Sequence, residues 1–130
     1  MSDVVRAELG DDPTVDITTI GRRSGAPRRI EIWMLEVDGR FFISGTPGRR
    51  DWLANLIATP QLTLHLKRDA KVDLPAHAAV VTDAGTRRTV LEHAAARWYR
   101  SQVDIDRLVA EAPMVEVVVD VPPSDAAVPS

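Results

Sequence analysis

Cysteine is absent from the 130-residue sequence. Its absence excludes disulfide bonds, thiolate metal sites and cysteine nucleophiles. Long apolar runs are also missing, since no segment approaches the ~20 residues that a membrane-spanning helix needs. The formal net charge is only -3, so no overall field draws the protein to nucleic acid or to an anionic membrane. These absences favour a cytoplasmic protein without a transmembrane segment and without a nucleic-acid partner, although peripheral membrane contact stays open.

Lysine is scarce as well. Only Lys67 and Lys71 are lysine among the 16 basic residues, and the other 14 are arginine. Guanidinium groups fit phosphate and carboxylate better than ammonium groups do. The excess of arginine therefore indicates either an anion-binding site or a compositional habit, and composition alone does not choose between them.

The residues that are present fit one small globular domain. Hydrophobic residues make up 45% and charged residues 27%, which excludes general disorder. Residues 1–14 are acidic and are predicted to form a mobile arm, neither a secretion signal nor a transit peptide. Residues 15–121 are the predicted folded domain, and residues 122–130, rich in proline and alanine, are predicted to be a disordered tail.

Alternation of apolar and polar residues predicts six strands, joined mostly by hairpins. The expected strands span residues 15–20, 28–37, 40–45, 61–68, 72–81 and 114–121. Asp38-Gly39 is a strong signal for a two-residue hairpin turn. Pro75 indicates that its strand is an edge strand or carries a bulge.

Helical spacing predicts three helices between these strands. A short helix is expected over residues 52–58 with Asp51 as its N-cap. A second helix carries Val90 to Trp98, and a third carries Ile105 to Ala112. Six strands with few covering helices tend to close into a barrel, which removes exposed edges. We therefore predict an α+β fold, a small antiparallel barrel with short flanking helices.

The segment from Thr19 to Arg29 carries the clearest chemical signal. Two glycines in it allow positive φ angles, which let successive backbone N–H groups turn toward one point. Ser24 adds a hydroxyl donor and Pro27 fixes the exit into the next strand. Four guanidinium groups bracket the turn, those of Arg22, Arg23, Arg28 and Arg29. The pattern indicates a phosphate or polycarboxylate site on a hairpin, unless the turn is simply solvated. Neither a Walker loop nor a Rossmann fingerprint is present.

These residues, with others downstream, resemble a known family. The pattern T-x-G-R-R-S-G-x-P-R-R ends at Arg29 and is followed by Ile32-Trp33, Asp38-Gly39 and a Gly-Thr-Pro-Gly loop. The run W-L-A-N-L then begins at Trp52 and ends before Thr59-Pro60-Gln61. The whole is similar to the deazaflavin-dependent nitroreductase family, small oxidoreductases with a split β-barrel fold. The resemblance extends over nearly the whole folded domain.

The resemblance implies a cofactor and a set of binding residues. The cofactor is the 8-hydroxy-5-deazaflavin coenzyme F420, whose tail bears a phosphodiester and several glutamates. Residues 15–121 then form a split-barrel cofactor-binding domain. The residues expected to hold the anionic tail are Arg22, Arg23, Ser24, Gly25, Pro27 and Arg28. Trp52 and Asn55 are expected near the cofactor. Trp33 and the loop from Ser44 to Thr46 are expected to border the deazaflavin ring and the substrate.

The family also implies a reaction, transfer of a hydride from reduced deazaflavin to a quinone, an activated alkene or a nitro group. A cofactor enzyme of this kind needs the protein to bind and orient rather than to supply a nucleophile. The catalytic residues are not fixed by the pattern, and Tyr99, Ser44, Thr46 or water are the candidate proton donors.

Two other readings of the residues stay open. An FMN-binding flavoprotein on a similar barrel would use the same turn for one phosphate, and a non-catalytic cofactor-binding protein would use it without chemistry. No metal site is expected, because His65, His77 and His93 are scattered along the chain. The chain is expected to be a monomer or a homodimer whose partner is a small-molecule electron acceptor.

Overall fold

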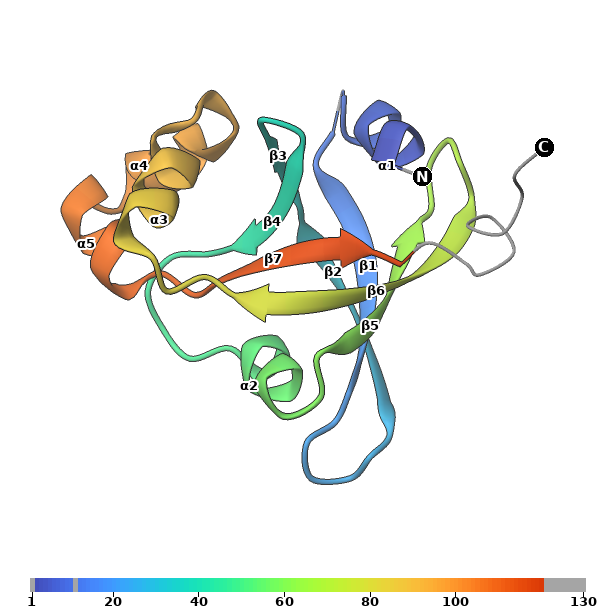
Figure 1. The fold of residues 1–130 in the computed structure, drawn as a ribbon. Helices are drawn as coiled ribbons and strands as arrows, with labels where there is room; N and C mark the ends of the chain where they lie inside the picture. Colours follow the sequence, from blue (N-terminus) through green and yellow to red (C-terminus); the bar gives the residue numbers. More distant parts are fainter. Residues whose placement is uncertain (1, 11, 121–130) are drawn as a thin grey trace.

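A computed structural model describes residues 2–10 and 12–120, and its centre is one curled antiparallel sheet (Figure 1). Seven strands lie in the order β2-β1-β5-β6-β7-β4-β3. The strands are β1 (Thr14–Ile20), β2 (Pro27–Trp33), β3 (Leu35–Val37), β4 (Arg40–Ser44), β5 (Gln61–Leu66), β6 (Val72–Val80) and β7 (Met114–Val119). The helical elements are α1 (Ser2–Leu9), α2 (Asp51–Ala58), α3 (Ala84–Glu92), the 3-10 turn η1 (Ala94–Ala96), α4 (Arg97–Gln102) and α5 (Ile105–Glu111). The predicted α+β split barrel with short flanking helices is confirmed.

The strand count differs from the expected six because the predicted strand over residues 28–37 is broken at Met34. Its first half, β2, pairs with β1, and its second half, β3, pairs with β4. The Met34 N–H still donates to the Pro13 carbonyl at 2.9 Å, one position beyond the last pair of β1 and β2, and the chain then turns into β3. One continuous segment therefore supplies both edge strands of the sheet, which brings the two edges of the curled sheet together.

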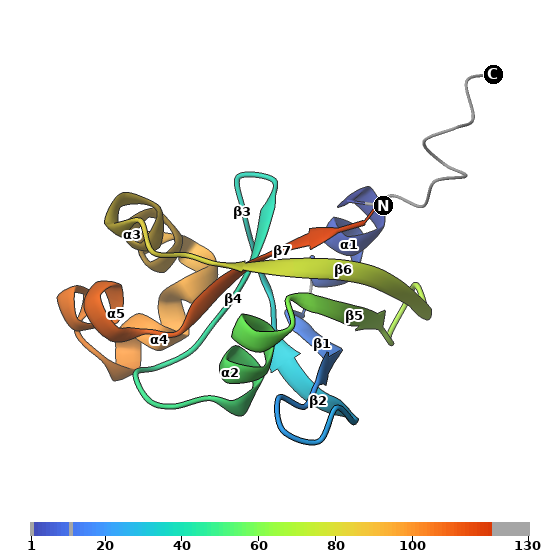
Figure 2. The same ribbon diagram turned by 60° about the horizontal axis from the view of Figure 1, so that its bottom comes forward.

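Two hydrophobic clusters lie on the two sides of β4. The first fills the inside of the curled sheet, where residues such as Ile17 and Leu64 are fully buried. Helix α2 covers part of this core with Trp52 and Leu56. The second cluster joins Phe42 to helices α3, α4 and α5, which gather on one side of the sheet away from α2 (Figure 2). Within residues 2–10 and 12–120, none of the helices has the length and apolar character needed to cross a bilayer.

The prediction of a mobile N-terminal arm is wrong for residues 2–9, which form α1. Val5 is fully buried in the core, and Glu8 is 1% exposed. The Glu8 carboxylate accepts backbone N–H groups of Arg68, Asp69 and Ala70 at 2.8–3.0 Å. Burial raises the pKa of Glu8, but these three N–H groups and the Arg68 guanidinium outweigh it and hold that pKa below its usual value. The turn at Arg68–Ala70, more than fifty residues away in the sequence, thus holds this polar N-terminal segment in place. The predicted tail, residues 122–130, lies outside the described residues.

Two further element predictions need correction. Strand β6 is not an edge strand, because β5 and β7 pair with its two sides. Pro75 is tolerated because the side of its backbone that lacks an N–H faces β7 just beyond the last residue pair of the β6–β7 ladder. At that position its carbonyl accepts the Asp120 N–H at 2.9 Å. The predicted helix from Val90 to Trp98 is interrupted at His93, whose extended backbone ends α3 and whose ring accepts the Ala95 N–H.

Local turn signals were more reliable. Asp38 and Gly39 both have positive φ, as the expected hairpin turn between β3 and β4 requires. Helix α2 starts one residue earlier than predicted, so that Arg50 occupies the N-cap position and Asp51 is the first helical residue. There Asp51 lies where the helix dipole favours a carboxylate.

Candidate functional site

The β1–β2 hairpin and helix α2 enclose a cavity of about 450 Å³. The residues that line it are Thr19, Gly21, Arg22, Arg23, Ser24, Arg28, Ile30, Asp51, Trp52 and Asn55. Six of them belong to the residues that the sequence predicts for the cofactor. Two segments more than twenty residues apart in sequence therefore meet around one open space.

The hairpin turn is shaped by its own hydrogen bonds. Gly21 N–H donates to the Ala26 carbonyl and Gly25 N–H to the Gly21 carbonyl, both at 2.8 Å. A side chain at Gly21 would place its Cβ 2.8 Å from the Ser24 hydroxyl oxygen and 3.2 Å from the Ala26 carbonyl oxygen, so Ser24 would have to rotate and the turn would have to shift. Gly25 has a φ of 71°, a conformation that favours glycine. Gly25 and Pro27 thus shape the turn without lining the cavity.

Part of the predicted cluster of free backbone N–H groups is used by the turn itself. The N–H groups of Gly21, Gly25 and Ala26 donate inside the turn, and that of Arg22 donates to Asn55. The N–H groups of Arg23 and Ser24 have no hydrogen-bond partner among the described residues. The donors at this turn are therefore guanidinium groups, the Ser24 hydroxyl and at most these two main-chain amides.

Asn55 ties the turn to helix α2. Its side-chain oxygen accepts both the backbone N–H and the guanidinium of Arg22 at 3.1 Å. Its amide nitrogen donates to the Thr19 hydroxyl at 3.2 Å, and the residue is only 4% exposed. Both polar atoms of the side chain thus contact the turn, so Asn55 holds Arg22 at the cavity, while one of its two amide N–H groups has no partner among the described residues.

Three of the four arginines of the turn face the cavity. Arg22 also lies 3.4 Å from Asp51, the one carboxylate in the lining. The side chains of Arg23 and Arg28 form no hydrogen bond with any residue of the described ranges. Arg29 instead points to the opposite face of the hairpin, where it donates to Asp16 at 2.9 Å. Strand alternation explains the separation, since neighbouring residues of β2 project to opposite faces.

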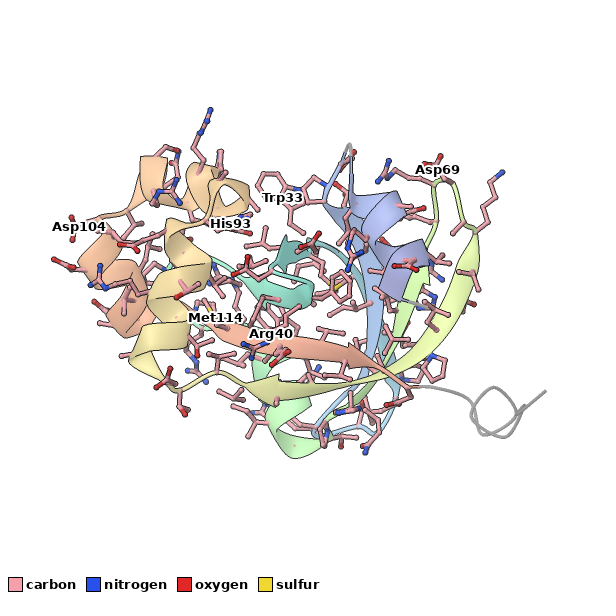
Figure 3. The ribbon with its side chains drawn as sticks, turned by 45° about the horizontal axis from the view of Figure 1, so that its top comes forward. Trp33, Arg40, Asp69, His93, Asp104 and Met114 are labelled. Atoms are coloured by element: carbon pink, nitrogen blue, oxygen red, sulfur yellow. The ribbon has the colours of Figure 1, made fainter. Side chains whose placement is uncertain are left out.

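A second group of predicted residues lies near the other end of β2. The rings of Trp33, Trp98 and Tyr99 pack edge to face, with centroids 5.6–6.1 Å apart. Tyr99 is 5% exposed, whereas Trp33 and Trp98 remain 37% and 50% exposed. Figure 3 shows Trp33 at the rim of the sheet, near the helical side of the molecule. Trp33 therefore does not line the arginine cavity but belongs to an aromatic cluster of its own.

The loop from Thr46 to Arg50 leads from β4 into helix α2. The Arg50 guanidinium donates to the carbonyl of Thr46 at 2.9 Å and to its hydroxyl at 3.3 Å. Arg50 immediately precedes Asp51 of the cavity, and its charge also acts on Tyr99. Burial raises the pKa of Tyr99 and Arg50 partly offsets this, so the phenol stays protonated at neutral pH.

The three candidate proton donors differ in how they are engaged. Ser44 is buried and donates its hydroxyl to the Pro113 carbonyl at 2.6 Å. Thr46 accepts from Arg50. The Tyr99 hydroxyl forms no hydrogen bond with another described residue, and its oxygen is not among the buried groups that lack a partner. The hydroxyl protons of Tyr99 and Thr46 are thus not committed to an acceptor among the described residues, whereas that of Ser44 is.

Histidine belongs neither to the lining of the arginine cavity nor to the aromatic cluster. His65 bridges Thr18 and Asp73, with its two ring nitrogens 2.7 Å from each partner, on the outer face of the sheet. His77 contacts Asp120 at 2.7 Å. In the ranges that the structure describes, no group of three or more histidine, aspartate and glutamate residues is arranged to hold a metal ion.

The residues predicted to bind the cofactor leave out four residues of the cavity, namely Thr19, Gly21, Ile30 and Asp51, although Thr19 and Gly21 belong to the segment that carries the chemical signal. Strand alternation could have found two of them, because Thr19 pairs with Arg28 and Ile17 with Ile30 across the hairpin. Asp51 was read only as a helix cap. The contact between Asp51 and Arg22 spans 29 residues and has no local signature in the sequence.

Comparison with known proteins gives one family match. A family model described as F420H(2)-dependent quinone reductase matches residues 3–120. No curated protein matches the chain.

Several solved structures share the fold. An F420-H2 dependent reductase (FDR-A) has a TM-score of 0.58 and 21% identity, covering 82% of this chain and 95% of that one. The heme storage protein HutZ from Vibrio cholerae has a TM-score of 0.67 and 14% identity, covering 92% and 90%. A protein described as a domain-swapped dimer has a TM-score of 0.58 and 19% identity, covering 89% and 92%. At these identities the likeness establishes the fold alone.

Proposed function

The chain belongs to the F420H(2)-dependent quinone reductase family, and on this premise we propose that it reduces a small electron-poor acceptor with reduced F420. The observation that carries the proposal is the cavity between the β1–β2 hairpin and α2, where Arg22, Arg23 and Arg28 converge. Guanidinium groups are the side chains best suited to phosphate and carboxylate. We assign this cavity to the anionic tail of the cofactor.

The residues present fit that tail. Three guanidinium groups face one carboxylate, that of Asp51, so the lining carries an excess of positive charge. A phosphodiester followed by glutamates offers several anions to several arginines, whereas FMN offers a single phosphate. Ser24 adds a hydroxyl that can still donate its proton, because its oxygen accepts from the Ala26 N–H. The number of free arginine donors thus supports F420 over FMN.

The aromatic cluster and the Thr46–Arg50 loop are the proposed surroundings of the ring and the acceptor. Reduced F420, when bound, supplies a hydride. Addition of this hydride and one proton converts a quinone to a hydroquinone. Trp33 and Tyr99 offer an apolar wall, and the Tyr99 hydroxyl is the proposed source of the proton. Thr46 is held in place by Arg50 and is proposed to border the same space.

The acceptor class and the assembly are parts of the same proposal. A quinone is the first choice because of the family, and an activated alkene or a nitro compound are the alternatives. Strand β2 has an outer edge unpaired among the described residues, and its Ile30 and Trp33 are each 37% exposed. This open edge could pair with a second copy of the chain, so both a monomer and a homodimer are compatible with it. In either case we propose a cytoplasmic location.

Fluorescence titration with F420 and with FMN tests the cofactor assignment. We expect saturable binding of F420 at micromolar concentrations and weaker binding of FMN. The variant carrying Arg23→Ala and Arg28→Ala should bind F420 at least about tenfold more weakly, because two charged contacts are removed. Arg29→Ala is the matched control, since that guanidinium lies on the opposite face with Asp16. Equal losses in both variants, or no binding by the wild type, would contradict the assignment.

A second measurement tests the reaction. Purified protein is mixed with reduced F420 and menadione, and F420 oxidation is followed by its absorbance. Turnover well above the protein-free rate is expected. Tight F420 binding without turnover would favour the non-catalytic cofactor-binding alternative.

A further inference from the structure

The two edge strands of the sheet differ in how far they are covered. Strand β3 is short, its Leu35 and Val37 are almost fully buried, and α1 and η1 contact it. Strand β2 is longer, and its residues 27–31 are all exposed. Figure 1 shows the β1–β2 hairpin projecting beyond the rest of the sheet. The outer edge of β2 is therefore open to another strand, a state that folded proteins rarely leave without a safeguard.

The ladder between β1 and β2 shows which main-chain groups of β2 face outward. The Met34 N–H donates to the Pro13 carbonyl, so Met34 bonds toward β1. Such bonds alternate along an antiparallel pair, so every second residue of β2 before Met34 also bonds toward β1. The residues between them direct their main-chain groups to the free side, and Arg29 and Glu31 are two of these. Pro27 also belongs to this outward set, where its missing N–H breaks no bond of the ladder.

The side chains of β2 favour one symmetric register with a second copy. Antiparallel copies pair through residues whose main-chain groups face outward, so the two-fold axis passes beside one residue and its own copy. An axis at Ile30 places Arg29 opposite the partner's Glu31, and this pair occurs twice. An axis at Arg28, Arg29 or Glu31 instead places like charges directly opposite each other, which is unfavourable. An axis at Ile32 leaves Arg29 and Glu31 without opposite charges.

The charged side chains of this register already lie on one face of the sheet. Lys67 lies 2.7 Å from Asp16 and also pairs with Glu31, and Arg29 donates to Asp16 at 2.9 Å. Asp16 is mostly covered, whereas the side chains of Arg29 and Glu31 remain 53% and 64% exposed. Both therefore have room for a further ion pair. On the other face, contact with its own copy would cover Ile30, whose apolar side chain is partly exposed.

We propose that the chain forms a symmetric dimer in which the β2 strands of two copies pair antiparallel about Ile30. Main-chain hydrogen bonds join Arg29 to the partner's Glu31 and Glu31 to the partner's Arg29, and the same side chains form two ion pairs. The edge charges repel this strand in a shifted register and select a second copy of this chain in one register. All residues that line the arginine cavity come from one copy, so the dimer does not depend on the proposed function.

Sedimentation equilibrium of the full chain tests the dimer. We expect dimers to dominate at about 100 μM. A wild type that stays monomeric at this concentration would overturn the proposal.

Charge reversal tests the register. Arg29→Glu and Glu31→Arg each place like charges opposite each other in both ion pairs, so each should raise the dimer dissociation constant at least about tenfold. An equimolar mixture of the two variants restores opposite charges in both pairs of a mixed dimer. The mixture should therefore associate within about threefold of the wild type. Arg107→Glu makes the same charge change on α5, away from β2, and should dimerise like the wild type.

The mixture guards against a trivial loss of folding, because Arg29 and Glu31 also contact Asp16 and Lys67. A damaged chain is not repaired by a second damaged chain unless the two meet at the altered residues. Single variants that dimerise like the wild type, or a mixture that stays monomeric, would refute the register.

F420 titration of the same samples separates the dimer from the proposed function. Monomeric variants that bind F420 as the wild type does support the dimer contact and leave the cofactor assignment in place. A wild type that dimerises as expected but does not bind F420 loses the cofactor assignment and keeps the dimer.

Discussion

Asn55 allows the geometry of the arginine cavity to be separated from its charge. In Asn55→Ala, the Arg22 N–H and guanidinium lose their acceptor and Thr19 loses a donor. An unsatisfied, partly buried donor costs about 1–3 kcal/mol. We therefore expect unfolding to become about 2–3 kcal/mol easier. F420 binding should weaken about 5–30-fold, because Arg22 is no longer held toward the ligand.

Asn55→Asp keeps the shape and both acceptor contacts to Arg22 but adds a negative charge beside the anion site. The Thr19 hydroxyl can reverse and donate to the new carboxylate. Stability should therefore stay within about 1 kcal/mol of the wild type. Repulsion of the anionic tail at a few ångströms amounts to about 1–3 kcal/mol at a partly buried site, which weakens binding about 5–150-fold.

Urea unfolding and F420 fluorescence titration on the same preparations provide the two readouts. The reasoning is refuted by an Asn55→Asp variant that binds F420 as tightly as the wild type, because the tail would then lie elsewhere. If Asn55→Ala lost binding with unchanged stability, Asn55 would contact the cofactor itself instead of positioning Arg22.

Three other residues give independent predictions. Arg87 is buried, burial lowers its pKa, and its guanidinium donates to four backbone carbonyls, including those of Val81 and Ala112. Arg87→Met should lower the free energy of unfolding, measured by urea titration, by about 3 kcal/mol, because these carbonyls lose their donor. Glu8 has a folded pKa below its ordinary 4.5, so its stabilisation is complete above that pH and is lost as the pH falls below it; Glu8→Gln should be less stable near pH 7 and should lose less stability than the wild type between about pH 6 and pH 3. Tyr99→Phe should bind F420 normally but lower kcat about 10–100-fold, while a kcat equal to that of the wild type would exclude Tyr99 as the proton donor.

Much of the fold was predictable because its signals are local. The alternation in β1 matches the structure, since Val15, Ile17 and Thr19 face inward. The glycines of the β1–β2 turn and the Asp38-Gly39 hairpin specify conformations that few other residues adopt. Helix α2 follows from its apolar spacing and from Pro60 after its end.

The remaining features depend on partners far away in the sequence. Alternation identifies two faces of β2 but not what covers them, so it does not show that Ile30 is 37% exposed. The acidic start of the chain gave no sign that Glu8 would be bound by the turn at Arg68–Ala70. Asn55 matched the family pattern, yet only the fold shows that its partner is Arg22.

The order of the strands has a consequence for synthesis of the chain. Strand β7 lies between β6 and β4 and is the hydrogen-bonded link between them in the described part of the chain. Until Met114–Val119 has left the ribosome, β2-β1-β5-β6 and β4-β3 are two sheet fragments with open edges at β6 and β4. Pairing Phe41 with Val117 closes a loop of more than seventy residues, a contact of the kind that makes folding slow. Until β7 emerges, the nascent protein therefore exposes two open strand edges of the kind that favours aggregation, and β7 is needed to join the fragments into a single sheet.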